Sequence, residues 1–324
     1  MISASITFGE AAAWLKIRDG FLIITHRRPD GDALGSAGAL AQGLREAGKT
    51  AYVLYNPETT PRYMRFVQDY IAPEEYKPDY IIAVDTASYE LFPKDDEHYG
   101  VVSLCIDHHP SNTMYAEKTC LYGSRASCGE IVYEILLVLI GKISAKCAGH
   151  LYAAVSTDTG CFAFANTTSN TLRVASLLVE SGAPHTQLNK LLFRTKSRSR
   201  VKIEGMIFSG LEYHFGGTVA ISTITKKMVD SIGAVEDDLD DIASIPGSVE
   251  GVLVGITIRE MTSDHDCKIS VRTTQTVDAH AICERYSGGG HAMAAGCVIK
   301  KTAKEVKRSL LETMKDFIPQ EARN

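Results

Sequence analysis

The sequence lacks the features of a membrane protein, a zinc-ribbon protein and a binder of long duplexes. It has no apolar run long enough to span a bilayer and no signal peptide. It contains eight cysteines but no Cys-x-x-Cys pair, which argues against a zinc ribbon or a dithiol redox site. The formal net charge is -5, whereas proteins that grip long duplexes are usually basic. We therefore expect a cytoplasmic protein with reduced thiols and no membrane partner.

The composition is that of an ordinary globular chain. The 324 residues suggest two domains, and the hydrophobic fraction of 45% is sufficient for a real core. No internal repeat or low-complexity segment stands out. Function must therefore be sought in short motifs rather than in overall composition.

The first informative motif follows the apolar run Phe21–Ile24, which predicts a buried strand of a parallel sheet. His26, Asp30 and Asp32 come directly after this strand, where open α/β sheets bind their ligands. An imidazole and two carboxylates suit a divalent metal, because unpaired charge is costly to bury. Taken alone, the motif is equally compatible with a solvated acidic loop.

Two further predicted strands end in the same kind of residue. Asp85 stands at the end of the strand 79–84, and His108 and His109 follow the strand 101–106 and Asp107. Strands alternate with predicted helices at 9–19, 33–47, 62–70, 127–140, 145–156 and 170–180, and a further strand is predicted at 51–55. This alternation predicts an α/β fold with a doubly wound, mostly parallel sheet and helices on both faces.

The helix at 127–140 begins with a capping-box signature, Ser127 followed by Glu130. Capping explains both residues without a role in substrate binding. Cys128 and Gly129, which lie between these two residues, put none of the predicted metal-site residues in doubt.

The second half of the chain has a different pattern. Residues 187–211 stay helical and carry five cations in nine positions, at Arg194, Lys196, Arg198, Arg200 and Lys202. We interpret this segment as a connector whose charges form a solvated face, with Arg194 as the best candidate for a ligand contact. Beyond it, strands near 218–225, 249–259 and 268–274 alternate with helices near 237–244, 279–286 and 302–317. These elements predict a smaller α/β domain.

The polar residues at the strand ends predict a two-metal centre. Asp158, which follows the predicted helix 145–156, completes the set. Its members are His26, Asp30, Asp32, Asp85, His108, His109 and Asp158. Four clustered carboxylates repel one another unless cations neutralise them. Mixed imidazole and carboxylate ligands fit Mn²⁺ best, with Mg²⁺, Fe²⁺ or Co²⁺ as alternatives. Two such ions can activate a shared water and clamp the oxygens of a phosphoryl displacement.

These motifs resemble a known family. His26-x3-Asp30-x-Asp32, Asp85, Asp107-His108-His109 and Asp158 are similar, in order and spacing, to the four motifs of the DHH phosphoesterase superfamily. Gly288-Gly289-Gly290-His291 resembles the signature of its associated C-terminal domain. The stretches 157–162, 166–168 and 171–173 resemble the branch of nano-RNases that also act on pAp.

The resemblance implies a domain division and a role for each site residue. Residues 1–186 would form the metal-binding catalytic DHH domain, 187–211 the helical connector and 212–324 the substrate-binding domain. One metal would be held by His26, Asp30 and Asp85, and the other by Asp32, Asp85, His108 and Asp158. Asp85 would bridge the two ions, Asp107 would orient a histidine ring, and His109 would face the scissile phosphate. A purely structural role for His109 stays open.

The substrate end is predicted to lie in the second domain. Consecutive glycines at Gly288, Gly289 and Gly290 let backbone N–H groups approach an anion, and His291 at the end of this loop can donate to a phosphate or stack on a base. Alone, this loop could equally be a flexible turn. The resemblance gives Arg272 a phosphate-binding role, which its planar fork of donors suits; a surface arginine is the alternative.

We therefore expect a manganese-dependent hydrolase that binds its substrate between two domains. It would cut short oligoribonucleotides (nanoRNA and linear dinucleotides such as pApA or pGpG) to mononucleotides, and pAp to AMP and phosphate. A cyclic-dinucleotide phosphodiesterase and a RecJ-like single-strand exonuclease are alternatives within the same chemistry. A non-catalytic nucleotide sensor is an alternative of another class. Substrate preference, cleavage polarity and a homodimer stay open.

Overall fold

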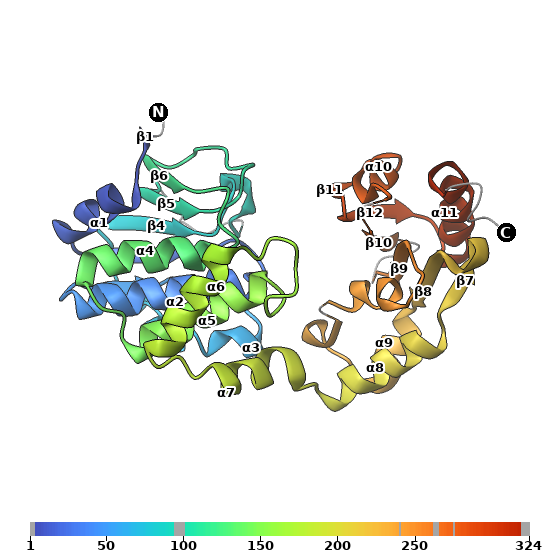
Figure 1. The fold of residues 1–324 in the computed structure, drawn as a ribbon, viewed down its shortest axis with the longest axis horizontal. Coiled ribbons are helices and arrows are strands. Elements are labelled where there is room, and N and C mark those ends of the chain that lie inside the picture. The colour runs from blue at the N-terminus through green and yellow to red at the C-terminus, as the bar shows by residue number, and fades with distance from the viewer. Residues whose placement is uncertain (1–3, 94–100, 240, 262–265, 275, 319–324) are drawn as a thin grey trace. The chain divides into compact units, whose positions relative to one another are not determined.

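The chain folds into two compact units in the computed structural model, Met1–Thr195 and Lys196–Asn324 (Figure 1). The structure describes residues 4–93, 101–239, 241–261, 266–274 and 276–318. The division between the units falls inside the segment 187–211 that the sequence marks as a connector.

The first unit is built on a six-stranded sheet with the strand order β1-β6-β5-β4-β2-β3, in which every pairing is parallel. The strands are β1 (Ala4–Ser5), β2 (Phe21–Ile24), β3 (Ala51–Val53), β4 (Tyr80–Val84), β5 (Leu104–Asp107) and β6 (Lys118–Leu121). β2, β4 and β5 are neighbours at the centre, so their carboxyl ends meet at one edge. The sequence predicted four of these strands and missed β1 and β6.

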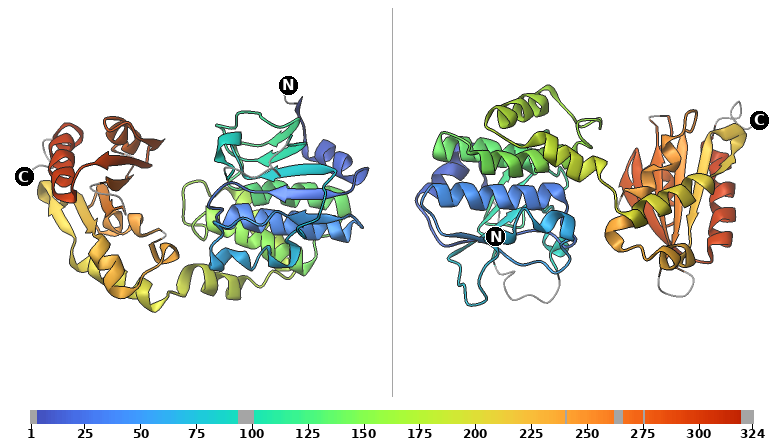
Figure 2. Two further views of the ribbon diagram at one scale, coloured as in Figure 1. Left: turned by 180° about the vertical axis from the view of Figure 1, so that it is seen from behind. Right: turned by 90° about the horizontal axis from the view of Figure 1, so that it is seen from below.

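The helices of this unit pack on one face of the sheet (Figures 1 and 2). They are α1 (Phe8–Lys16), α2 (Gly31–Glu46), α3 (Pro61–Met64), η1 (Gln68–Tyr70), α4 (Cys128–Ile140), α5 (Ala145–Asp158), α6 (Ser169–Glu180), α7 (His185–Asn189) and η3 (Lys190–Arg194). The short helix η2 (Tyr89–Leu91) instead packs against Phe92 on the other face.

The two faces of β2 show how the sheet is covered. Phe21 and Ile23 join the helical core, whereas Leu22 and Ile24 point to the opposite face and meet Phe92 and other residues of connecting segments. Among the described residues, no long helix contributes to this second cluster. The expectation of helices on both faces was therefore wrong for this part of the chain.

Small residues of α2 allow a close approach of α5. A Cβ atom at Gly35 would lie 2.7 Å from the carbonyl oxygen of His150, and one at Gly38 would lie 2.2 Å from that of Phe66. Gly35 therefore sets the distance between α2 and α5, one of which begins and the other of which ends at the candidate site. Gly38 instead admits the backbone of the segment between α3 and η1.

The second unit contains a six-stranded sheet of order β11-β12-β10-β9-β8-β7, in which β8 and β9 are parallel and the other pairings are antiparallel. Its strands are β7 (Glu212–His214), β8 (Val219–Ile224), β9 (Val254–Glu260), β10 (Asp266–Thr273), β11 (Gly289–His291) and β12 (Ala294–Lys300). Its helices are α8 (Arg198–Ser209), η4 (Phe215–Gly217), α9 (Lys226–Ile232), η5 (Glu236–Leu239), η6 (Ile242–Ser244), η7 (Pro246–Ser248), α10 (Ala279–Glu284) and α11 (Ala303–Phe317). The sequence missed β7, β11, β12 and α9.

The predicted connector is not one helix. The π-helical segment η3 ends at Arg194, Thr195 adopts an extended conformation, and Ser197 begins α8 by accepting a hydrogen bond from the amide of Arg200. The helix is thus broken at the boundary between the two units.

These observations confirm the predicted fold class, an α/β protein with a parallel sheet followed by a smaller α/β unit. The described helices include none that combines the length and apolar character needed to cross a membrane.

Candidate metal centre

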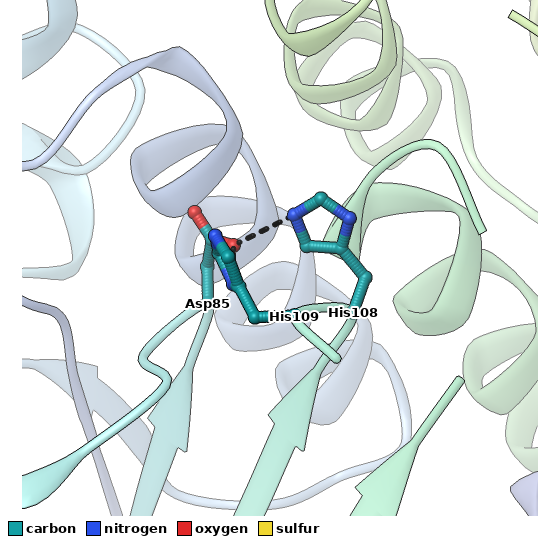
Figure 3. A group of neighbouring side chains, drawn as sticks. All are labelled: Asp85, His108 and His109. Atoms are coloured by element: carbon teal, nitrogen blue, oxygen red, sulfur yellow. Dashed lines mark ion pairs between the residues drawn. The ribbon is translucent and has the colours of Figure 1, made fainter. Parts of the chain in front are cut away.

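Three neighbouring strands place polar residues at the same edge of the first sheet. His26 lies two residues beyond β2, Asp85 directly follows β4, and Asp107 ends β5 before His108 and His109. Because β2, β4 and β5 are parallel neighbours, these side chains converge. Figure 3 shows Asp85 close to His109 and His108, with its ion pair to His108 drawn as a dashed line.

The N-terminus of α2 adds two carboxylates to this edge. Asp30 is the N-cap of α2 and accepts hydrogen bonds from the amides of Asp32 and Ala33, both at 3.0 Å. Asp32 lies in the first turn of α2 and is buried. Gly31 between them has no room for a side chain, because a Cβ atom there would lie 2.5 Å from the Thr157 side chain.

The Asp32 carboxylate is also held by the N-terminus of α4. The amide of Cys128 donates to its Oδ2 at 2.7 Å, the amide of Gly129 donates to its Oδ1 at 2.9 Å, and Ser36 Oγ donates to the same Oδ1 at 3.2 Å. Helix N-termini favour negative charge. The sequence missed this role of residues 128 and 129, since a backbone donor leaves no signature in residue type.

The imidazole of His108 connects three carboxylates. Its Nε2 atom lies 3.4 Å from Asp85 Oδ1, 3.7 Å from Asp158 Oδ2 and 3.8 Å from Asp32 Oδ2. Asp158 is the last residue of α5.

His26 lies on the other side of Asp85, with its Nε2 atom 3.9 Å from Asp85 Oδ2. Three overlapping groups thus offer ligand atoms within 4.8 Å of one another: His26, Asp30 and Asp85; Asp32, His108 and Asp158; and Asp85, His108 and His109.

Backbone carbonyls orient two of the histidines. The Nδ1 atom of His26 lies 2.7 Å from the carbonyl oxygen of Arg27, and that of His108 lies 3.2 Å from the carbonyl oxygen of Arg125. A carbonyl oxygen only accepts hydrogen bonds, so each Nδ1 carries a proton and each Nε2 is turned toward the carboxylates, where it can ligate a metal. Metal-binding histidines are commonly oriented in this way.

The third histidine is oriented by a buried carboxylate. Asp107 Oδ1 lies 2.7 Å from His109 Nδ1 and accepts the amide of His108 at 2.8 Å, while Oδ2 accepts Asn112 Nδ2 at 2.6 Å. Burial favours the neutral form of Asp107, but the hydrogen bonds from His109 and Asn112 outweigh it and lower its pKa. The hydrogen bond to Asp107 raises the pKa of His109. Asn112 was not predicted from the sequence.

Burial and mutual repulsion raise the pKa of the central carboxyl groups. Burial raises the pKa of Asp85 well above its usual range, and the charge of Asp30 adds to this effect. Burial does the same for Asp32, with contributions from Asp85 and Asp158. Burial also raises the pKa of Asp158 to about 6. Clustered groups of this kind mark functional sites.

The residues present fit a metal. Asp85 Oδ1 is buried and accepts no hydrogen bond, although buried oxygens are nearly always paired. Asp85 also has a φ of 54°, in the left-handed region. A buried carboxylate oxygen without a hydrogen bond, two histidines that turn Nε2 inward and three further carboxylates form a donor set typical of first-row divalent metals.

The capping box predicted at α4 is only half present. Ser127 accepts the amide of Glu130 at 3.3 Å, as expected. The carboxylate of Glu130 instead accepts hydrogen bonds from Asn170 Nδ2 and Thr171 Oγ1, both at 2.6 Å. Glu130 therefore ties α6 to α4 rather than capping its own helix.

The glycine motif of the second unit is a strand rather than a loop. Gly289–His291 form β11, which pairs with β12 at the edge of the sheet, and His291 and Arg272 both stand opposite Ala294 in neighbouring strands. Residues directly opposite in antiparallel strands share a face, so the two side chains flank Ala294. Among the described residues, no ion pair involves Arg272.

The cations of the predicted connector are partly neutralised. Lys196 and Arg200 each contact Glu204 at 2.6 Å. Arg194 is exposed, and within the described ranges no ion pair includes it. Arg198 and Lys202 likewise take part in no ion pair among the described residues, so a ligand contact of Arg194 stays a prediction.

The parallel sheet, the aspartate–histidine cluster at its carboxyl edge and the separate second unit define a two-domain α/β protein with a candidate two-metal centre. The chain belongs to the DHH family. Residues 20–155 match the DHH family N-terminal domain, and residues 216–320 match the DHHA1 domain.

Several characterised and solved proteins are similar over most of the chain. The bifunctional oligoribonuclease and PAP phosphatase NrnA of Thermus thermophilus is 33% identical over 86% of this chain and 83% of its own length. The protein of the same name from Bacillus subtilis is 29% identical over 88% and 91%. The crystal structure of an exopolyphosphatase-related protein from Bacteroides fragilis has a TM-score of 0.84 at 22% identity and 95% coverage of both chains, which is a likeness of fold.

Proposed function

We propose that the chain is a metal-dependent phosphoesterase that hydrolyses short oligoribonucleotides to mononucleotides and pAp to AMP and phosphate. The observation that carries this proposal is the meeting of two histidine–carboxylate groups at one sheet edge around Asp85. The two NrnA proteins, which carry the names oligoribonuclease and PAP phosphatase, supply the substrate class. We place this activity in the cytoplasm.

The residues divide into two ligand sets. His26, Asp30 and Asp85 would hold one ion, while Asp32, Asp85, His108 and Asp158 would hold the other, with Asp85 shared. Two bound divalent ions, for which Mn²⁺ is our first choice, would supply charge neutralisation and an activated water for phosphoryl displacement. The amides of Cys128 and Gly129 keep Asp32 in place, and the carbonyls of Arg27 and Arg125 keep the two imidazoles turned inward.

His109 has a different role from the ligands. Its Nδ1 atom lies 2.7 Å from Asp107, and the side chain is 41% exposed. Because the hydrogen bond to Asp107 raises the pKa of His109, the ring would also carry a proton on Nε2, which would contact the scissile phosphate and pass to the leaving oxygen. The same hydrogen bond occupies the Nδ1 atom that lies 3.6 Å from Asp85, which argues against ligation through this nitrogen.

The second unit would bind the part of the substrate away from the reacting phosphate. Arg272 and His291 on one sheet face offer charged and ring donors, and among the described strands only β12 pairs with Gly289–His291, along one edge. The exposed residue Gly289 lets an anion approach this backbone closely. Substrate length would be selected because the second unit holds one end of the chain.

The test is a substrate panel with purified full-length protein. Labelled dinucleotides, three- to five-nucleotide RNAs, pAp, a cyclic dinucleotide and single-stranded DNA are incubated with Mn²⁺, Mg²⁺ or Co²⁺, and products are separated by chromatography. We expect Mn²⁺-stimulated release of mononucleotides from the dinucleotides. Preferential cleavage of the cyclic dinucleotide or of long DNA would replace the proposal by one of the two alternative phosphoesterases. Nucleotide binding without turnover in any metal would establish the sensor.

A further inference from the structure

The segment after Asp158 has an uncommon backbone. Gly160, Cys161 and Phe162 have φ values of 55°, 56° and 68°, so three successive residues are left-handed. Residues other than glycine adopt this conformation at an energetic cost, and such strain gathers at functional sites. The turn is nevertheless secured, because the amide of Cys161 donates to the carbonyl of Ser156 at 2.7 Å and that of Phe162 donates to Thr159 Oγ1 at 3.2 Å.

The turn is tied to the candidate metal centre. The Nδ2 group of Asn166 donates to the carbonyl oxygen of Asp158 at 3.1 Å and to that of Ala126 at 3.2 Å. Asn166 therefore links the loop both to a predicted metal ligand and to the segment that precedes α4. A side chain on this loop keeps a defined position relative to Asp158.

The loop presents an aromatic ring. Phe164 is 59% exposed, and its ring edge rests on Gly160, where a Cβ atom would lie 2.4 Å from Cε1. A single exposed phenylalanine is unremarkable on a protein surface. Here, however, the ring is held by a strained and hydrogen-bonded turn only two residues from Asp158.

An arginine lies near the same turn. Arg194 is exposed and ends the π-helical segment η3, and π-helical turns are frequent at functional sites. The turn and the helix that leads into η3 pack on the same side chain, since the ring of Tyr152 lies 5.9 Å from that of Phe162 and 6.2 Å from that of His185 in α7. In agreement with this placement, burial raises the pKa of Cys161 and the charge of Arg194 opposes this effect. The turn thus has an aromatic face and a cation near it, the combination with which proteins bind nucleotides.

We propose that Phe164 and Arg194 form a nucleotide subsite on the first unit, in which a base stacks on the Phe164 ring and Arg194 pairs with a phosphate of the same substrate. The inference rests on the proposed function, and it adds a recognition element outside the metal ligands and outside the second unit. Stacking accepts every base, because each base has a π-face. The subsite therefore predicts tolerance of base identity at this position together with a requirement for a base.

The first experiment uses substrates that lack one base. Manganese-loaded wild type, Phe164→Ala and Phe164→Trp are compared on an intact dinucleotide and on two analogues in which one or the other base is replaced by hydrogen. We expect Phe164→Ala to lower kcat/KM on the intact dinucleotide by about tenfold or more, and Phe164→Trp to restore it. One of the two analogues should be cut equally by wild type and Phe164→Ala. An equal loss on all three substrates, or no loss on the intact one, overturns the stacking role.

Matched variants control for exposure and charge. Val138→Ala removes an exposed apolar side chain, 60% accessible, at the far end of α4 and should leave kcat/KM unchanged. Lys190→Ala removes an exposed cation from the same π-helical segment as Arg194 and should have little effect. Arg194→Ala should raise KM for the dinucleotide several-fold. The KM of this variant should also depend less on salt concentration than the KM of wild type. Equal effects of Lys190→Ala and Arg194→Ala refute a specific contact.

A second readout does not depend on turnover. A dinucleotide that carries the fluorescent base 2-aminopurine is titrated with wild type and Phe164→Ala in Ca²⁺. Stacking on Phe164 should change the fluorescence of the bound base in wild type but not in the variant. If this signal is present while wild type hydrolyses no substrate, the proposed function fails and the subsite stands. If hydrolysis occurs and the two proteins give the same signal, the subsite fails alone.

Discussion

Asp85 is the residue that both proposed ligand sets of the candidate centre share. We expect Asp85→Asn to abolish turnover and to reduce bound metal, because it removes the carboxylate that both ligand sets share. Asparagine tolerates the left-handed backbone that Asp85 adopts, so the fold should persist. The metal-free variant should be more stable than metal-free wild type, since one repelling charge is gone. Elemental analysis measures the bound metal, and thermal melts measure the stability of the metal-free proteins. If Asp85→Asn were as active in Mn²⁺ as wild type, Asp85 could not be the shared ligand.

Asn112 affects the chemistry only through its neighbours. Asn112→Ala leaves Asp107 Oδ2 without its 2.6 Å donor, and an unpaired buried acceptor costs about 1–3 kcal/mol. We expect kcat to fall while metal content stays normal, because Asp107 then holds His109 less firmly. His109→Ala sets the upper limit of the loss, on the order of 10²–10⁴-fold for a group in proton transfer. Loss of metal in either variant would instead assign these residues to ligand support.

The raised pKa of Asp158 predicts how stability depends on pH in the metal-free protein. A carboxyl group whose pKa is about 6 when folded and about 4 when unfolded binds its proton more tightly in the native state. Its favourable contribution is complete below about pH 4 and is lost as the pH rises to about 6. Asp158→Asn should therefore gain stability over wild type as the pH increases through this window, in chelator-treated samples followed by thermal melts. Saturating Mn²⁺ should reverse the order at pH 7.

Residue type alone was sufficient to find the candidate ligands, because each stands where an apolar run or a helix ends. The groups that hold these ligands and His109 in place could not be found from residue type. Asn112 reaches Asp107 through a local turn, and the amides of Cys128 and Gly129 are backbone donors that every sequence has. Only the packing of α4 beside α2 selects them.

Strands and helices with many apolar residues were predicted best from the sequence. The central strands and the long helices were predicted with ends within a few residues, whereas β1, β6 and β7 are short or lie at an edge and carry little apolar signal. The glycine motif was predicted as a loop because its composition resembles a turn. Pairing with β12, a tertiary interaction, makes it a strand.

The strand β11 offers a matched pair of glycine variants. Gly290 has a φ of 141°, and a Cβ atom there would lie 2.5 Å from the carbonyl oxygen of Ala294, whereas Gly289 has nothing within 4 Å. We expect Gly290→Ala to destabilise the β11–β12 pairing and to raise KM for dinucleotides strongly. Gly289→Ala should keep the stability of the second unit, which circular dichroism melts would show. Equal destabilisation by both variants would mean that the pairing does not require glycine geometry.

At the scale of the whole molecule, the proposed function assigns chemistry to one unit and substrate holding largely to the other. Arg272→Ala should lower kcat/KM for dinucleotides. The loss should correspond to about 1.5–3 kcal/mol of transition-state binding free energy, as expected for a hydrogen bond to a charged group. The same variant should hardly affect bis-p-nitrophenyl phosphate, which is small enough to need only the metal centre. Parallel losses on both substrates would show that the second unit supports the metal site itself.

The attachment of Asp32 to the start of α4 makes two amide protons natural reporters of the centre. The amides of Cys128 and Gly129 donate directly to the Asp32 carboxylate but belong to no proposed ligand. When a diamagnetic ion such as Mg²⁺ draws charge from that carboxylate, the nuclear magnetic resonance frequencies of both protons should shift together. Occupancy of the second ligand set could then be titrated in the unmodified protein, without a substrate, a label or a mutation.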